Sequence, residues 1–255
     1  MELTWMQFAV ILPLVGLAGF VDAIAGGGGL ISLPAYMIGG LPAHAAIATN
    51  KLSSFMGTSV ATGNYVKKGF VNWKYAGIGA FCALIGSSVG ANIALMISDH
   101  ILKIAMLFLL PAIAVYLAKR KDFAPIGKEP AEHGKMFVTA AAGLIIGLYD
   151  GLYGPGTGTF LLLILTGFAH MKLTEANGAT KVINLTTNIA SLVVYLMNGQ
   201  PVIILGLCAG VCNMIGNYLG SNFFSSKGAG AVRPIMFVVL GIFFVKVLYD
   251  LHLFG

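Results

Sequence analysis

One stretch of this sequence occurs twice, at residues 22–54 and again at residues 150–184. Each copy has an aspartate, a glycine-rich break, a short apolar run and then a lysine within the next apolar segment. The copies are offset by 128 residues at the aspartates and by 130 residues from the lysines onward. The matched residues are Asp22 and Asp150, Lys51 and Lys181, Tyr65 and Tyr195, Cys82 and Cys212, Gly86 and Gly216, and Gly90 and Gly220. The sequence therefore predicts two copies of one unit, residues 1–118 and 136–255, with residues 119–135 as the linker.

The composition places both units in a membrane. Hydrophobic residues make up 58% of the chain, charged residues only 9%, and the mean hydropathy is +0.89. A soluble domain would carry roughly 25% charged residues. The net charge of +6 comes mostly from lysines and arginines in short loops. Such charges orient a membrane protein, so we expect no nucleic-acid partner.

The apolar segments predict an all-α, polytopic membrane fold with about 8 to 10 membrane segments, since spanning takes about 20 residues. In each unit one apolar run is too short to span and follows the glycine-rich break. The long segments are residues 3–23, 43–66, 75–97, 101–118, 136–149, 174–197, 202–224 and 232–251. The short runs are residues 30–38 and 160–168.

The charged loops predict that the two units are inverted. With the basic linker in the cytoplasm, an inverted second unit also places Lys172, Lys227 and Arg233 there, whereas a parallel unit would place them outside. Both termini then face the periplasm of a multi-pass inner-membrane protein. Residues 3–40 must enter and return, so each unit is expected to begin with a broken, re-entrant hairpin that turns at the glycines.

The two breaks are the first candidate binding elements. A helix N-terminus offers unpaired N–H groups and a partial positive charge, and glycines let an anion approach them. The alternative is tight turns or close helix packing. The candidate residues are Gly26, Gly27, Gly28 and Gly29, and Gly156, Thr157, Gly158 and Thr159. The threonines of the second break predict chemically unequal half-sites. An anion cradle predicts that Gly28→Ala loses binding and keeps its melting temperature.

Two lysines within apolar helices are the second candidate element. A lysine at the bilayer centre costs roughly 2.5–3.5 kcal/mol, so it normally faces the interior and marks a pathway. Lys51 and Lys181 each lie on a polar helical stripe, although snorkelling to the interface is the alternative. The stripe residues assigned to anion binding are Asn50, Lys51 and Ser54, and Thr180, Lys181 and Asn184. Alanine at either lysine is expected to weaken anion binding and leave folding intact.

The aspartates that precede the breaks have three open roles. Asp22 and Asp150 pair with the lysines, bind a coupling proton, or hold the hairpin tip. The five histidines show no metal-ligand spacing, so we assign no metal and no cofactor.

The breaks, together with the runs TNKLSS at residues 49–54 and ATKVIN at residues 179–184, resemble the TauE/SafE sulfite exporter family over essentially the whole chain. The resemblance implies an inner-membrane permease for sulfur-containing anions such as sulfite, thiosulfate or sulfoacetate. It also implies anion handling at Gly26–Gly29, Asn50, Lys51, Gly156–Gly158 and Lys181. We therefore expect a secondary transporter that works by alternating access around a central anion site. Its partners are a small anion and the lipid bilayer, and a homodimer is left open.

Two other functions compete with transport. A passive anion channel would use the same polar residues but conduct large unitary currents. An intramembrane aspartyl hydrolase would use Asp22 and Asp150 as a carboxylate pair that shares a proton. The hydrolase gives no reason for the paired lysines, so we predict that the protein is not an enzyme.

Overall fold

The computed structural model describes residues 4–119 and 125–227, and these residues form helices without any strand. The helices are α1 (Trp5–Ala25), α2 (Gly29–Ile38), α3 (Ala43–Lys67), α4 (Trp73–Met96), α5 (Asp99–Lys119), α6 (Glu132–Leu152), α7 (Thr157–Gly167), α8 (Leu173–Met197) and α9 (Ile203–Lys227). The all-α prediction is confirmed. The expected segment at residues 232–251 lies outside the described residues.

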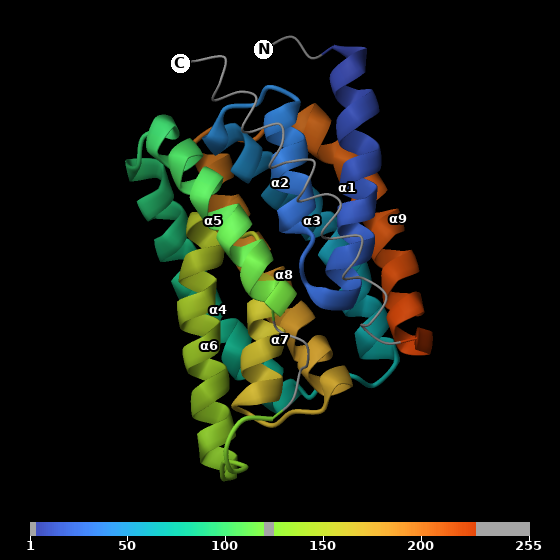
Figure 1. The fold of residues 1–255 in the computed structure, drawn as a ribbon, viewed down its shortest axis with the longest axis vertical. Coiled ribbons are helices and arrows are strands. Elements are labelled where there is room, and N and C mark those ends of the chain that lie inside the picture. Colours follow the sequence, from blue (N-terminus) through green and yellow to red (C-terminus); the bar gives the residue numbers. More distant parts are fainter. Residues whose placement is uncertain (1–3, 120–124, 228–255) are drawn as a thin grey trace.

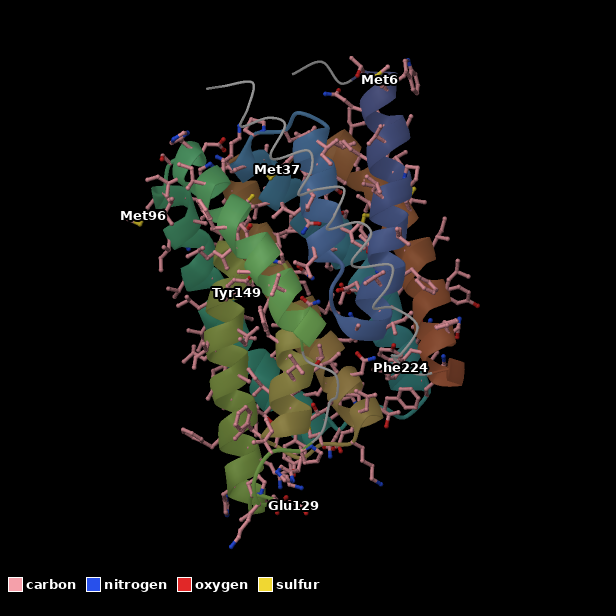
Figure 2. All side chains as sticks on the ribbon, viewed as in Figure 1. Met6, Met37, Met96, Glu129, Tyr149 and Phe224 are labelled. Carbon is pink, nitrogen blue, oxygen red and sulfur yellow. The ribbon has the colours of Figure 1, made fainter. Side chains whose placement is uncertain are left out.

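The two units are inverted relative to each other. Figure 1 shows that α1 to α4 run in directions opposite to those of α6 to α9, helix by helix. Near the ends of two matched helices, Met96 of α4 lies in the upper half of Figure 2 and Phe224 of α9 lies in the lower half. The inversion predicted from the charged loops is therefore present in the fold.

Each unit begins with a broken hairpin. In the first unit α1 ends at Ala25, and Gly26 adopts a left-handed conformation with φ of 72°. The chain then turns into α2, which returns toward the end where α1 begins, so Met6 and Met37 both lie toward the upper end in Figure 2. In the second unit α6 and α7 make the matching hairpin around Gly154 and Gly156, which also have positive φ. The re-entrant hairpins predicted at the glycines are confirmed.

The units are intertwined instead of standing side by side. Helix α4 packs along α6, α9 packs along α1, and α3 crosses α8 at the centre. Glycines allow the close approach: a Cβ on Gly90 would overlap the carbonyl oxygen of Leu148, and one on Gly216 would overlap that of Gly16. Small residues at such contacts are typical of helix packing in membranes. Because its main partners belong to the other unit, neither unit is complete alone.

The outer surface is apolar. Phe81 of α4, Phe137 of α6 and Ile204 of α9 are 69%, 74% and 70% exposed, respectively. Within the described part of the chain, five helices are long and apolar enough to cross a bilayer: α1, α4, α6, α8 and residues 203–224 of α9. An exposed apolar belt of this extent indicates contact with lipid. The chain is thus a multi-pass membrane protein.

Candidate functional site

The two glycine-rich breaks meet at the centre of the bundle. A Cβ on Gly158 would lie only 2.5 Å from the Cα of Gly26, and one on Gly29 would lie 3.0 Å from the Cα of Pro155. Backbones approach this closely only where no side chain intervenes. The contact brings the N-termini of α2 and α7, one from each unit, to the same place.

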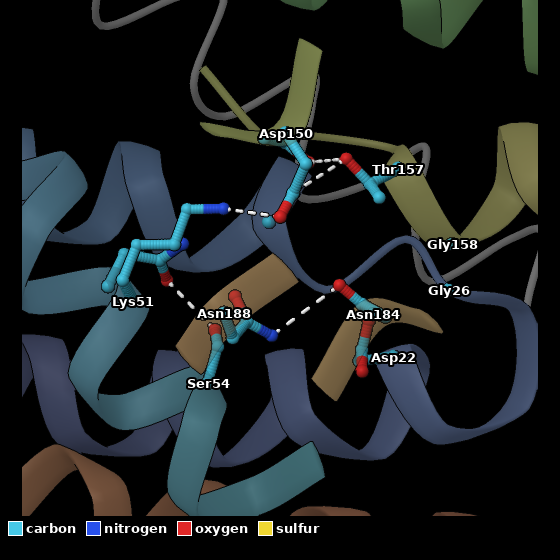
Figure 3. Close-up of a pocket in the computed structure, with 12 residues that line it drawn as sticks. Asp22, Gly26, Lys51, Ser54, Asp150, Thr157, Gly158, Asn184 and Asn188 are labelled. Carbon is cyan, nitrogen blue, oxygen red and sulfur yellow. Dashed lines mark hydrogen bonds and ion pairs between the residues drawn. The ribbon is translucent and has the colours of Figure 1, made fainter. Parts of the chain in front are cut away.

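A small polar pocket lies where the breaks face the middle of α3 and α8 (Figure 3). Its volume is about 20 Å³, which is room for about one water molecule. The lining residues are Asp22, Gly26, Gly29, Asn50, Lys51, Ser54, Asp150, Gly154, Thr157, Gly158, Asn184 and Asn188. Both units contribute, so the structure has one shared pocket where the sequence suggested two related half-sites.

Lys51 of α3 pairs with Asp150 of α6. The ammonium Nζ lies 2.6 Å from Oδ2 of Asp150, and the two side chains are 2% and 3% exposed. Oδ1 of the same carboxylate accepts a 2.7 Å hydrogen bond from the hydroxyl of Thr157. Asp150 is therefore held by a cation and a hydroxyl, both fully desolvated.

Lys181 of α8 makes the matching pair with Asp22 of α1. Nζ lies 2.7 Å from Oδ2 of Asp22 and also donates to the backbone oxygen of that residue. Lys181 is 0% exposed, whereas Asp22 is 14% exposed. Gly29 stands where the second unit has Thr157, and within the described residues no hydroxyl donates to Asp22. The two aspartates therefore differ in their partners: Asp150 has a hydroxyl donor and Asp22 has none among the described residues.

Each lysine thus pairs with the aspartate of the other unit. Of the three roles open for the aspartates, the structure shows pairing with the lysines for both and, at Asp150, also a hydrogen bond to Thr157 at the tip of the hairpin. Two tyrosines fix the aspartate-bearing turns from within each unit: Tyr65 donates to the carbonyl of Ala23 at 2.7 Å, and Tyr195 donates to that of Gly151 at 2.9 Å. The prediction that Lys51 and Lys181 face the interior is confirmed, and snorkelling is excluded.

The pocket has no net formal charge in this arrangement. Two ammonium groups face two carboxylates, and the remaining side chains are neutral. Asn188 donates to Oδ1 of Asn184 at 3.4 Å, and the hydroxyl of Ser54 lies 3.5 Å from Oδ1 of Asn50. These weak bonds leave amide and hydroxyl groups able to turn toward a ligand. In the described part of the chain, no group of histidine, cysteine and acidic side chains is arranged to hold a metal ion.

The sequence-predicted site residues fall into two groups. Ten line the pocket: Asp22, Gly26, Gly29, Asn50, Lys51, Ser54, Asp150, Thr157, Gly158 and Asn184. Six do not, namely Gly27, Gly28, Gly156, Thr159, Thr180 and Lys181, although Lys181 reaches the pocket through Asp22. Thr159 instead donates to the carbonyl of Ala25 at the end of α1. Two lining residues, Gly154 and Asn188, were not assigned; Asn188 lies seven residues after Lys181, on the same helical stripe.

The fold and the pocket together define a class. Inverted units, discontinuous helices at matching positions and a polar site at their interface are features of membrane transporters. Comparison with known sequences agrees with this class. The family model described as Sulfite exporter TauE/SafE matches residues 11–247, and the chain belongs to that family of membrane transporters.

Relatives of similar length carry transporter names. The chain is 32% identical over 249 residues to the probable membrane transporter protein ORF9 of Sinorhizobium sp, covering 98% of this chain and 95% of the relative. It is 30% identical over 236 residues to the probable membrane transporter protein YfcA of Escherichia coli strain K12, covering 92% and 87%. A probable membrane transporter protein of Haemophilus influenzae is 32% identical over 251 residues, with 96% of each chain covered. No solved structure matches the chain significantly.

Proposed function

We propose that the protein is a secondary transporter that moves a small anion across the membrane by alternating access. The anion binds in the shared pocket. The observation that carries the proposal is a pair of buried lysines at one pocket: Lys51 lines it beside the N-termini of α2 and α7, and Lys181 binds its lining residue Asp22. Ammonium groups, amides and helix N-termini are the groups that bind oxyanions in proteins. The family description supports a sulfur-containing anion: sulfite, thiosulfate or an organosulfonate such as sulfoacetate.

The pocket in this structure is too small for the proposed substrate. A sulfur oxyanion needs several times the room of the water molecule that fits there now. Both lysines are also occupied by aspartates. An arriving anion must therefore separate at least one ion pair and widen the contact between the breaks. This requirement favours a carrier that closes around its substrate over a permanently open channel.

The hydrolase alternative has less support. Catalysis by a carboxylate pair needs two aspartates that share one proton. Asp22 and Asp150 instead each bind their own lysine, at 2.7 Å and 2.6 Å. Each carboxylate thus has a lysine of the other unit as its partner, and within the described residues no hydrogen bond joins the two carboxylates.

The binding test is a calorimetric screen of purified protein with sulfite, thiosulfate, sulfoacetate, taurine, sulfate and acetate. We expect Lys181→Gln to weaken binding of the best anion by at least about tenfold, since a charge-assisted hydrogen bond contributes roughly 1.5–3 kcal/mol. Lys103→Gln is the matched control, because Lys103 is an exposed lysine remote from the pocket. Wild-type affinity in the Lys181 variant, or no binding of any anion, would contradict the proposal that the pocket is the anion site.

The orientation follows from the lysines at one end of the molecule. Lys74 of α4 pairs with Glu132 of α6, and Asn72 bonds to Glu175 of α8, so three helices begin together at the end that holds Glu129 in Figure 2. Met6 lies at the opposite end. The lysines that belong to the basic end are Lys67, Lys68, Lys74, Lys128, Lys135 and Lys172. By the positive-inside rule we propose that this end is cytoplasmic in the inner membrane and that the N-terminus faces the periplasm. The C-terminus, which was also predicted to be periplasmic, lies outside the described residues.

Reporter fusions test this orientation. We expect a periplasm-active phosphatase at the N-terminus to be active, and the same reporter inserted at Gly127 in the central loop to be inactive. Gly127 suits the insertion because no atom lies near its added Cβ. A cytoplasm-only fluorescent reporter should give the reciprocal pattern. Two active or two inactive phosphatase fusions would contradict the proposed sidedness.

A further inference from the structure

The charge balance of the pocket limits how an anion can enter it. The pocket is lined by Lys51, Asp150 and Asp22, and Lys181 reaches it through its ion pair with Asp22. It has room for about one water molecule. If an anion takes a lysine, the aspartate released from that lysine faces the anion in a confined, poorly hydrated space. Two neighbouring negative charges without compensation are strongly unfavourable there. A positive charge must therefore enter with the anion.

The two aspartates are not equally suited to receive that charge. Asp150 is 3% exposed and is held by both Lys51 and Thr157. Asp22 is 14% exposed and is bound by Lys181 without a hydroxyl partner among the described residues. Separating Lys181 from Asp22 breaks its contacts with Oδ2 and with the backbone oxygen, but the carboxylate of Asp22 has more access to water than that of Asp150 and no second described side chain to hold it.

Few charged groups surround Asp22, so few of them could balance its charge after Lys181 has moved away. Lys181 of α8, Lys51 and Tyr65 of α3 and Asp150 of α6 are the titratable groups that face the pocket or the turn of Asp22. Helices α2 and α7 carry no charged side chain, and α9 carries one only at its last residue, Lys227. No further cation from these packed helices can therefore balance a released Asp22.

From these contacts, and resting on the anion site proposed above, we propose that Asp22 is the proton-coupling residue and that the anion and a proton occupy the pocket together. A proton from water binds to the carboxylate of Asp22, and the ammonium of Lys181, still protonated, moves from that carboxylate to the anion. Lys51 and Asp150 stay paired throughout. The pocket gains the charge of the anion and one positive charge, so its net charge is unchanged for a monovalent anion and becomes one negative for a divalent anion such as thiosulfate.

Proton uptake during binding tests this inference on the wild-type protein. The probe is thiosulfate, which is fully ionised near pH 7 and brings no proton of its own. Calorimetry in two buffers of different ionisation enthalpy gives the number of protons taken up, and linkage predicts about one per thiosulfate bound. Binding without proton uptake would overturn the coupling and leave the anion site standing. Absence of binding by both thiosulfate and sulfoacetate would overturn the anion site itself, and the coupling with it.

Variants assign the proton to a residue. Asp22→Asn should bind thiosulfate with proton uptake reduced to near zero, and Asp22→Glu should restore the uptake. Glu129→Gln is the control and should keep the wild-type proton number, because Glu129 is 66% exposed, pairs with Lys135 and does not line the pocket. Continued uptake in Asp22→Asn, or loss of uptake in Glu129→Gln as well, would show that Asp22 is not the acceptor. The same titration with choline in place of sodium should give the same result. If binding requires sodium, the coupling ion is sodium and not a proton, and the inference is wrong.

Discussion

Lys51→Met is expected to destabilise the protein by about 3–5 kcal/mol, because removing one partner of a buried ion pair leaves an uncompensated charge. Asp150 would keep the hydroxyl of Thr157 as a donor but would lose its cation while its side chain is 3% exposed. Methionine has a similar length and no charge, so the change tests the ion pair and not the packing. The measurement is the melting temperature of the purified variant in detergent without ligand.

A double variant separates the ion pair from the residues that make it. Lys51→Met with Asp150→Asn removes both charges, and we expect it to melt closer to the wild type than Lys51→Met does, because neutral replacements of buried pairs are often tolerated. Lys103→Met is the surface control: Lys103 is 53% exposed and lies 3.9 Å from Asp99, so its loss should cost at most about 1 kcal/mol. Equal melting of the wild type and Lys51→Met would contradict the buried pair.

This expectation differs from the one that the sequence supported. The sequence shows Lys51 as a costly lone cation in an apolar helix, whose removal would leave folding intact. Its partner is 99 residues away along the chain and belongs to the other unit. Helical periodicity identifies which residues share a stripe on one helix, but it carries no information about which helix faces that stripe. The pairing of Lys181 with Asp22, which are 159 residues apart, could not be predicted for the same reason.

The parts of the fold that could be predicted are those that local sequence encodes directly. The constant offset revealed the two units, and the charged loops indicated their inversion because lysines and arginines set orientation in membranes. The breaks at Gly26 and Gly156 were visible as glycines between apolar runs. The packing of α4 on α6 and of α9 on α1 was not visible, because it depends on the fit of complete helix surfaces.

The sequence located the glycine-rich breaks correctly but did not show what each glycine contacts. The sequence predicted that Gly28 belongs to an anion cradle, so that Gly28→Ala would lose binding and keep its melting temperature. A Cβ on Gly28 would in fact lie 2.6 Å from the Cβ of Asp22 and 2.7 Å from the carbonyl oxygen of Ala18. Gly28 therefore packs against α1 and does not line the pocket. We expect Gly28→Ala to melt at a lower temperature even without ligand.

The larger effect is expected at the contact between the breaks. Gly158→Ala places its Cβ 2.5 Å from the Cα and 2.9 Å from the carbonyl oxygen of Gly26, so backbone must move against backbone. Overpacking of this kind typically costs about 1–3 kcal/mol. Gly26→Ala adds strain of roughly 1–2 kcal/mol, because its φ of 72° is a left-handed conformation that alanine disfavours. Both variants should therefore lower the melting temperature without ligand, and Gly26→Ala should lower it more.

Gly63→Ala is the matched control for these two variants, because it adds the same methyl group within α3 at a position with no other atom within 4 Å of the new Cβ. Alanine favours a helix over glycine by about 1 kcal/mol, so this variant should melt at or above the wild-type temperature. If Gly26→Ala and Gly158→Ala also melt like the wild type, the two breaks are not in contact as described. Since that contact brings the N-termini of α2 and α7 together, the shared pocket would then lose the backbone that joins its two halves.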